Sequence, residues 1–183
     1  METFEDIRRF YMNSPVSYLM LNLLTVYPGT KLYKKAETQN RLLNLPSAYL
    51  NGIVPTMKYK NMNTGEMLEQ YIKVQQDIYS YESVLKKANL IFSEGIPLKK
   101  RYGLSWRDLL SGIFYILKTF VFTRDKNARL LFQELHKLAR KRGVASSFIM
   151  EYLFFMQAGK IYFQRLSRQK EELLKQLDYY SSI

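Results

Sequence analysis

The apolar run "VSYLMLNLLTV", residues 16–26, constrains the fold more than any other stretch of this sequence. It lies between Pro15 and Pro28 and contains no charged side chain. An almost continuous apolar run closed by prolines suits a strand that is buried on both faces, as the strands of parallel sheets are. Such a strand needs a neighbour on each edge and cover on each face. We therefore predict a small α/β portion near the N-terminus.

Short helices and a turn flank this predicted strand. Apolar residues at helical spacing predict a helix over roughly the first ten residues, which should stop before Asn13 because Pro15 follows closely. A second helix should run from Lys31 to about Asn40, with Thr30 as its N-cap and with Leu32, Tyr33 and Ala36 facing inward. The pair Asn51-Gly52 commonly closes a hairpin turn, so we expect short strands on either side of it.

Beyond residue 60 the sequence predicts helices. Asn63 and Glu66 form a capping-box pattern ahead of a helix that continues, with a bend near Ser80, up to Gly95. Three more helices are expected. The first runs from Ser105 to about Phe122, the second follows Thr123 or Arg124 and ends where Gly143 can take a left-handed cap, and the third runs from Ser146 to about Tyr179. The predicted fold is mainly α with a small α/β N-terminal portion. It is divided into residues 1–60 and a helical C-terminal extension, residues 61–183, in which residues 64–179 form a bundle that holds most of the core.

The residue types exclude several kinds of catalytic centre. The 183 residues include no cysteine, so this chain has no disulfide, no thiolate zinc site, no cysteine nucleophile and no thiolate ligand for an iron-sulfur cluster. The single histidine, His136, lies between Leu135 and Lys137, where we expect a residue at the edge of the core. The acidic residues occur where they cap or solvate helices, so we predict no catalytic residue and no metal ligand.

The charge indicates an anionic partner. Lysine and arginine number 28 against 16 acids, which gives a net charge of +12. Two basic clusters could bind the phosphates of nucleic acid or of an anionic membrane, although ending helices is the commoner use of such residues. They are Lys99, Lys100 and Arg101, and Arg140, Lys141 and Arg142. The start of the sequence has no apolar signal and no apolar stretch is long enough to span a bilayer, so we expect a cytoplasmic protein.

The stretch "LNLLTVYPGTKLY" resembles the last part of the barrel in radical S-adenosylmethionine proteins. The likeness is closest to the cobalamin-binding-domain-associated subgroup, in which "LLTPYPGTPLY" marks the sixth strand and the loop that leaves it. Val26 and Lys31 depart from the usual prolines. "ETFEDIRRF" is similar to the helix before that strand, and "RLL…YLNG…MNTGEMLEQYIKVQQDIYS" to the C-terminal extension after it, so the resemblance covers residues 1–92. The matching residues of the motif are Leu24, Thr25, Tyr27, Pro28, Gly29, Thr30, Leu32 and Tyr33.

The resemblance implies that this chain is the C-terminal, non-catalytic portion of such an enzyme. Its N-terminal part would be the remnant of a (β/α) barrel end, and the missing strands would carry the CxxxCxxC loop. The chain would then be the product of a truncated gene, the product of an internal start, or a deliberately cut piece of the enzyme. Its partner would be the missing barrel or a protein that bears one, and its exposed strand edge would favour self-association.

The resemblance also implies the cofactors and the site. Intact members bind a 4Fe-4S cluster, S-adenosylmethionine and in many cases cobalamin, and perform radical reactions such as methylation; we expect none of these cofactors on this chain alone. Leu24, Thr25 and Val26 correspond to the strand end that lines the adenine of S-adenosylmethionine, largely through backbone groups. The other interpretation of these three residues is a plain core strand. The other function considered is a standalone basic helical module that binds nucleic acid or an anionic membrane.

Overall fold

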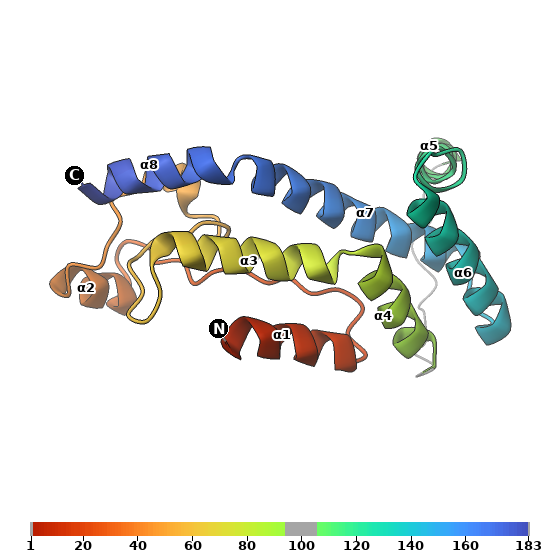
Figure 1. The fold of residues 1–183 in the computed structure, drawn as a ribbon, viewed down its shortest axis with the longest axis horizontal. Helices are drawn as coiled ribbons and strands as arrows, with labels where there is room; N and C mark the ends of the chain where they lie inside the picture. The colour runs from red at the N-terminus through yellow and green to blue at the C-terminus, as the bar shows by residue number, and fades with distance from the viewer. Residues whose placement is uncertain (1, 94–105, 183) are drawn as a thin grey trace. The chain divides into compact units, whose positions relative to one another are not determined.

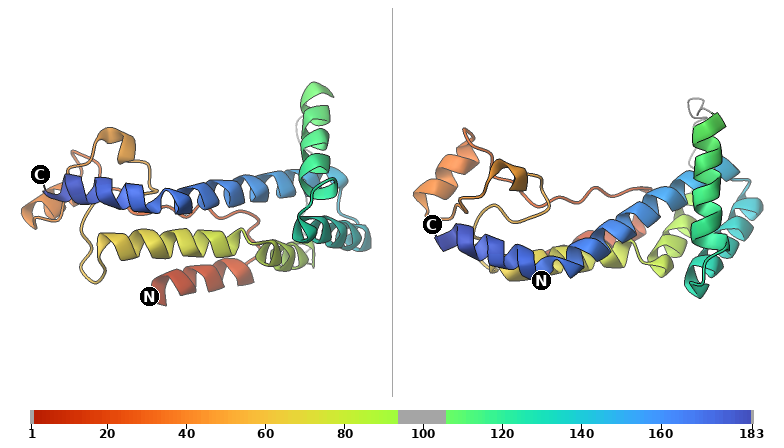
Figure 2. Two further views of the ribbon diagram at one scale, coloured as in Figure 1. Left: turned by 45° about the horizontal axis from the view of Figure 1, so that its top comes forward. Right: turned by 90° about the horizontal axis from the view of Figure 1, so that it is seen from above.

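A computed structural model describes residues 2–93 and 106–182, and these are mainly helical (Figure 1, Figure 2). The predicted helical class is therefore confirmed. The chain divides into two compact units. Of the described residues, the first unit contains 2–4, 20–75 and 163–182, and the second contains 5–19, 76–93 and 106–162.

The first unit is built from helix α2 (Lys31–Thr38), the 3-10 turn η1 (Ser47–Tyr49), most of α3 (Thr64–Ile78), the end of α7 (Ser146–Arg168) and α8 (Lys170–Ser182). The predicted caps are confirmed. Thr30 Oγ1 accepts the N–H of Tyr33 at 3.1 Å. Asn63 and Glu66 cap α3 reciprocally, because each side chain accepts the other residue's backbone N–H, at 2.8 and 3.1 Å.

A small apolar cluster lies beneath α2 in this unit. Its buried members, Val26, Ala36 and Met57, come from three separate segments of the sequence. Leu32, Tyr33, Leu42 and Tyr59 pack against them half-buried. The helical spacing of Leu32, Tyr33 and Ala36 thus does place them inward, as predicted. A second contact joins α3 to α7, where the rings of Tyr71 and Phe163 meet edge to face at 5.9 Å.

The strand predicted at residues 16–26 is not formed, and neither is the hairpin around Asn51-Gly52. The run is extended, but no strand occurs among the described residues. The physical reason is that another pairing forms nearby. Residues 56–58 bond to the backbone of residues 41–43 and not to the apolar run, with an antiparallel bridge between Leu42 and Met57. The run consequently has no ladder. In the part of the chain that the structure describes, an α/β portion or a barrel remnant is not seen.

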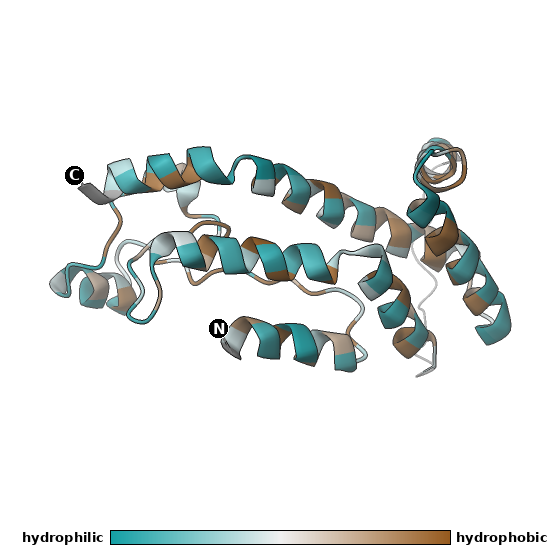
Figure 3. Ribbon diagram, in the orientation of Figure 1, coloured by the Kyte–Doolittle hydropathy of each residue, from teal (hydrophilic) through white to brown (hydrophobic). Residues whose placement is uncertain are grey.

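The second unit contains most of α1 (Glu2–Asn13), α4 (Tyr81–Ser93), α5 (Trp106–Ile116), the π-turn η2 (Leu117–Val121), α6 (Lys126–Arg142) and most of α7. Figure 3 shows apolar patches that recur along α7 between polar residues, the pattern of a helix with one buried face. Tyr152 of α7 is fully buried, and its hydroxyl donates to the carbonyl of Val84 in α4 at 3.1 Å. Other core residues of this unit are Ala88, Ile91, Phe120, Leu131, Leu135 and Leu153.

Several helix ends differ from those predicted. The helix expected to bend near Ser80 ends at Ile78, and Ser80 caps α4 by accepting the N–H of Ser83 at 3.2 Å. The long C-terminal helix is interrupted at Gln169, which separates α7 from α8. Asp125 is the N-cap of α6, not Thr123 or Arg124, because its carboxylate accepts two N–H groups of the first turn. The predicted left-handed cap at Gly143 is confirmed, with φ of 67°. Ser105 lies outside the described residues.

Candidate functional site

The segment that carries the motif, residues 20–27, is the candidate site and is called the extended segment below. Its side chains alternate between two sides over residues 20–25. Met20 and Leu24 are 85% and 57% exposed, whereas Leu23 is buried. One side therefore packs on the first unit, and the other presents apolar groups to solvent, as a strand with one uncovered face would.

Side chains hold the extended segment in place. The hydroxyl of Thr56 accepts the N–H of Val26 at 3.0 Å and lies 3.5 Å from the carbonyl oxygen of Leu24. The carbonyl of Leu21 accepts two bonds from α3, from the Tyr71 hydroxyl at 3.1 Å and from the Gln75 amide at 3.0 Å. These residues of α3 are buried. These side chains hydrogen-bond to the backbone of the extended segment, as the backbone of a neighbouring strand would in a sheet.

Most of the segment's backbone donors are unused. Within the described residues, only Leu23 and Val26 among residues 20–26 donate their N–H to another group of the chain, Leu23 to the carbonyl of Gly52 at 2.7 Å. The N–H groups of the neighbouring positions have no partner in this part of the chain. A row of free donors beside exposed apolar side chains is what an open sheet edge presents.

The Pro28-Gly29-Thr30 turn connects this segment to α2. Gly29 has φ of +83°, a conformation that side chains with a Cβ rarely adopt. Thr30 stabilises the turn twice, because its hydroxyl donates to the carbonyl of Tyr27 at 2.7 Å and caps α2. The Tyr27 hydroxyl donates to the carbonyl of Leu50 at 3.2 Å. The motif thus forms an extended segment, a tight turn and a capped helix.

The three predicted cofactor-binding residues occupy different environments in the extended segment. Val26 is buried in the apolar cluster, Leu24 is exposed, and Thr25 is half-buried with its hydroxyl donating to the carbonyl of Leu23 at 3.3 Å. Their role beside an adenine remains a prediction. The sequence does not predict the role of Thr56, because a lone threonine in a loop belongs to no recognisable pattern.

The described residues hold no group of three or more histidine, aspartate or glutamate side chains placed to bind a metal ion. His136 is half-buried and stacks on Phe132 with ring centroids 5.3 Å apart, which confirms the expected position at the edge of the core. A cavity of about 180 Å³ in the second unit is lined by Arg8, Arg9 and Lys86 among others. Both arginines already pair with acids of α1, at 2.6 and 3.6 Å.

Lys87 is the most deeply buried charged residue among those described, and its role is structural. Its ammonium group donates to the backbone carbonyls of Tyr11 and Ser14, at the end of α1, and lies 4.1 Å from the centre of the Tyr11 ring. Burial lowers the pKa of Lys87 to about 8 and raises the pKa of the Tyr11 hydroxyl. The carbonyl of Tyr11 also accepts from Ser14, so the lysine adds to the bonds that satisfy the carbonyls at the end of α1.

Of the two predicted basic clusters, the structure describes one. Arg140, Lys141 and Arg142 form the exposed last turn of α6, where the helix dipole favours cations and Gly143 ends the helix. Lys99, Lys100 and Arg101 lie outside the described residues. None of the helices that the structure describes combines the length and apolar character needed to cross a bilayer.

In comparisons with known proteins, no family model, no curated protein and no solved structure matches this chain.

Proposed function

We propose that this chain is the helical, non-catalytic C-terminal portion of a cytoplasmic radical S-adenosylmethionine enzyme, and that its extended segment completes the edge of the barrel sheet. The observation that carries the proposal is the row of free N–H donors on the extended segment, directly before the Pro28-Gly29-Thr30 turn. In the family that the motif resembles, this turn follows the last strand of the barrel.

The exposed side chains of the segment suit addition to a sheet. Strand addition gains affinity from main-chain hydrogen bonds and specificity from alternate side chains. Met20 and Leu24 are four residues apart, so in a strand their side chains point to the same face, which here is the exposed one. The layer that packs on the barrel strand would therefore cover both. Thr56, Tyr71 and Gln75 keep the other side attached to the first unit.

In this function the barrel supplies the cluster ligands, and the cofactors bind where the barrel and the extended segment meet. The chain would contribute backbone groups near the adenine. The Thr56 hydroxyl already engages the N–H of Val26, so the N–H groups of Leu24 and Thr25 are the donors left to meet a ligand. S-adenosylmethionine and the 4Fe-4S cluster would supply the radical chemistry when bound, and cobalamin would serve in the members that use it.

The test begins with the coding DNA around this chain, searched for a barrel that carries CxxxCxxC in the same or a neighbouring reading frame. That barrel is produced together with the chain, and size-exclusion chromatography follows whether they form one species. A variant with Met20→Lys and Leu24→Lys should lose the association, because two charges would enter an apolar layer. Leu130→Lys is the matched control, since Leu130 of α6 is 55% exposed against 57% for Leu24. Association that survives the double substitution, or no association with the barrel, contradicts the proposal.

The alternative is a standalone basic module for an anionic partner, and the exposed last turn of α6 is the observation that favours it. Phosphate contacts make affinity fall steeply with salt. Titration of the chain with duplex DNA at increasing salt distinguishes the two functions. Steeply salt-dependent binding without barrel association would favour the module.

A further inference from the structure

The arm formed by residues 107–124, here called the α5 arm, consists of most of α5, the π-turn η2 and the residues before α6. Its large apolar side chains are unusually exposed: Leu110 is 62% exposed, Phe114 68% and Phe122 79%. Figure 2 shows the first half of α5 extending beyond the other helices of the second unit. Exposed apolar residues gathered on one element commonly mark an interaction surface.

In the described part of the chain, the arm is anchored near the end of α5. Ile116 and Phe120 are buried, and the Tyr115 ring meets that of Phe154 in α7 at 5.4 Å. Leu110 and Phe114 are four residues apart, so they lie on one side of α5, one turn from each other. The anchored end holds the helix in position while Leu110 and Phe114 stay in solvent.

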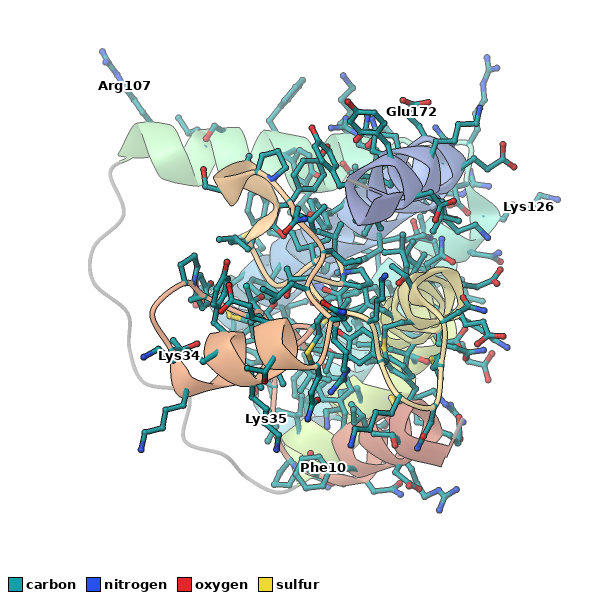
Figure 4. All side chains as sticks on the ribbon, turned by 90° about the vertical axis from the view of Figure 1, so that its left-hand side faces the viewer. Phe10, Lys34, Lys35, Arg107, Lys126 and Glu172 are labelled. Atoms are coloured by element: carbon teal, nitrogen blue, oxygen red, sulfur yellow. The ribbon has the colours of Figure 1, made fainter. Side chains whose placement is uncertain are left out.

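Cations accompany this apolar side. Arg107 precedes Leu110 by three residues and Lys118 follows Phe114 by four, and both are exposed. Figure 4 shows Arg107 pointing away from the ribbon at the start of α5. Residues 106–142 carry nine lysines and arginines against three acids, so half of the net charge of +12 lies in about a fifth of the chain. Two of these acids are occupied, Asp125 as the cap of α6 and Glu134 in an ion pair with Lys137 at 2.7 Å.

We propose that the α5 arm binds the surface of an anionic lipid bilayer. A helix of this kind lies in the headgroup region, with apolar side chains toward the acyl chains and long cationic side chains reaching the phosphates. Charge complementarity selects the anionic surface, because each lysine or arginine near such a membrane adds to the attraction. Nucleic acid would use the same cations but leave Leu110 and Phe114 in solvent. This inference does not depend on the barrel association proposed above.

The full chain is tested by flotation with vesicles of phosphatidylcholine alone and with about one-third phosphatidylserine. The chain should float with the anionic vesicles at low salt, and its partition coefficient should be at least about tenfold lower on the neutral ones. Roughly 0.5 M salt should weaken the binding, since it screens the charges.

Two variants test the arm itself. Leu110→Gln combined with Phe114→Gln should lower the partition coefficient about tenfold or more, because both apolar anchors are lost. Phe10→Gln is the matched control, since Phe10 of α1 is 67% exposed against 68% for Phe114, and it should bind as the natural chain does. Circular dichroism checks that both remain helical. The proposal is overturned by absent binding to anionic vesicles, by binding that the double variant keeps, or by an equal loss in the control. Binding of DNA without binding of vesicles would also overturn it.

Discussion

The side-chain hydroxyl of Thr56 lies 3.0 Å from the backbone nitrogen of Val26 and accepts its N–H. Both residues are 2% exposed, so water cannot replace this bond. In a sheet, the carbonyl of a neighbouring strand would accept this N–H. Here one side chain satisfies the buried donor, and the extended segment keeps its position without a ladder.

Thr56→Val should therefore destabilise the chain. Valine has nearly the same shape but no hydroxyl, so the N–H of Val26 would be buried without a partner at a cost of about 1–3 kcal/mol. Urea unfolding followed by circular dichroism measures the change. Thr56→Ser keeps the hydroxyl and should lose less; equal losses in the two variants would mean that packing, not the hydrogen bond, matters at this position.

Gly159→Ala should destabilise the second unit even though alanine favours helices. A Cβ at Gly159 would overlap the ring of Tyr79, which is buried. Overpacking of this kind costs about 1–3 kcal/mol. Gly112→Ala in α5 is the control, because a Cβ there meets nothing within 4 Å, and it should stabilise by about 0.5–1 kcal/mol. Thermal unfolding compares the two. If Gly159→Ala raises the melting temperature as Gly112→Ala does, the close approach of Tyr79 does not constrain this position.

The free energy of unfolding should rise between pH 8 and 10. The pKa of Lys87 is about 8 in the folded chain and near 10.5 when unfolded, so in this range the unfolded chain binds a proton that the folded chain does not. The rise should be about 1–3 kcal/mol. Above pH 10 the raised pKa of Tyr11 acts in the opposite direction, since its hydroxyl ionises more readily in the unfolded chain.

Lys87→Met isolates this contribution. The variant should show a smaller rise, and the part that remains belongs to Lys160, whose pKa burial also lowers. Urea unfolding at steps from pH 7 to 10 gives the two curves. Curves of equal slope would rule out Lys87 as the titrating group.

Hydrogen exchange should separate the extended segment from α7. Amides from Tyr18 to Val26 should exchange far faster than those of α7, with Leu23 and Val26 as the slower positions because their N–H groups are bonded. Mass spectrometry of peptides over both regions makes the comparison. Equal and strong protection of the two in a verified monomer would mean that the edge is already closed, and the barrel association would then have no basis.

Local sequence was enough to predict the helical class and several helix ends. Thr30, the Asn63 and Glu66 pair and Gly143 act through bonds to backbone groups within a few residues, so their sequence patterns alone predict the caps. The same holds for the inward positions of α2, where helical spacing determines which side chains share a face.

Whether residues 16–26 form a strand depended on segments that are distant in the sequence. An apolar run becomes a strand only when another segment pairs with it through backbone hydrogen bonds. Here residues 56–58 make such bonds with residues 41–43. Thr56, Tyr71 and Gln75 then bond to the run through side chains, contacts separated by 30 or more residues in sequence. Sequence alone therefore determined the elements whose bonds are local, and the tertiary structure decided which segment would pair, because that choice is a competition between distant groups for the same donors and acceptors.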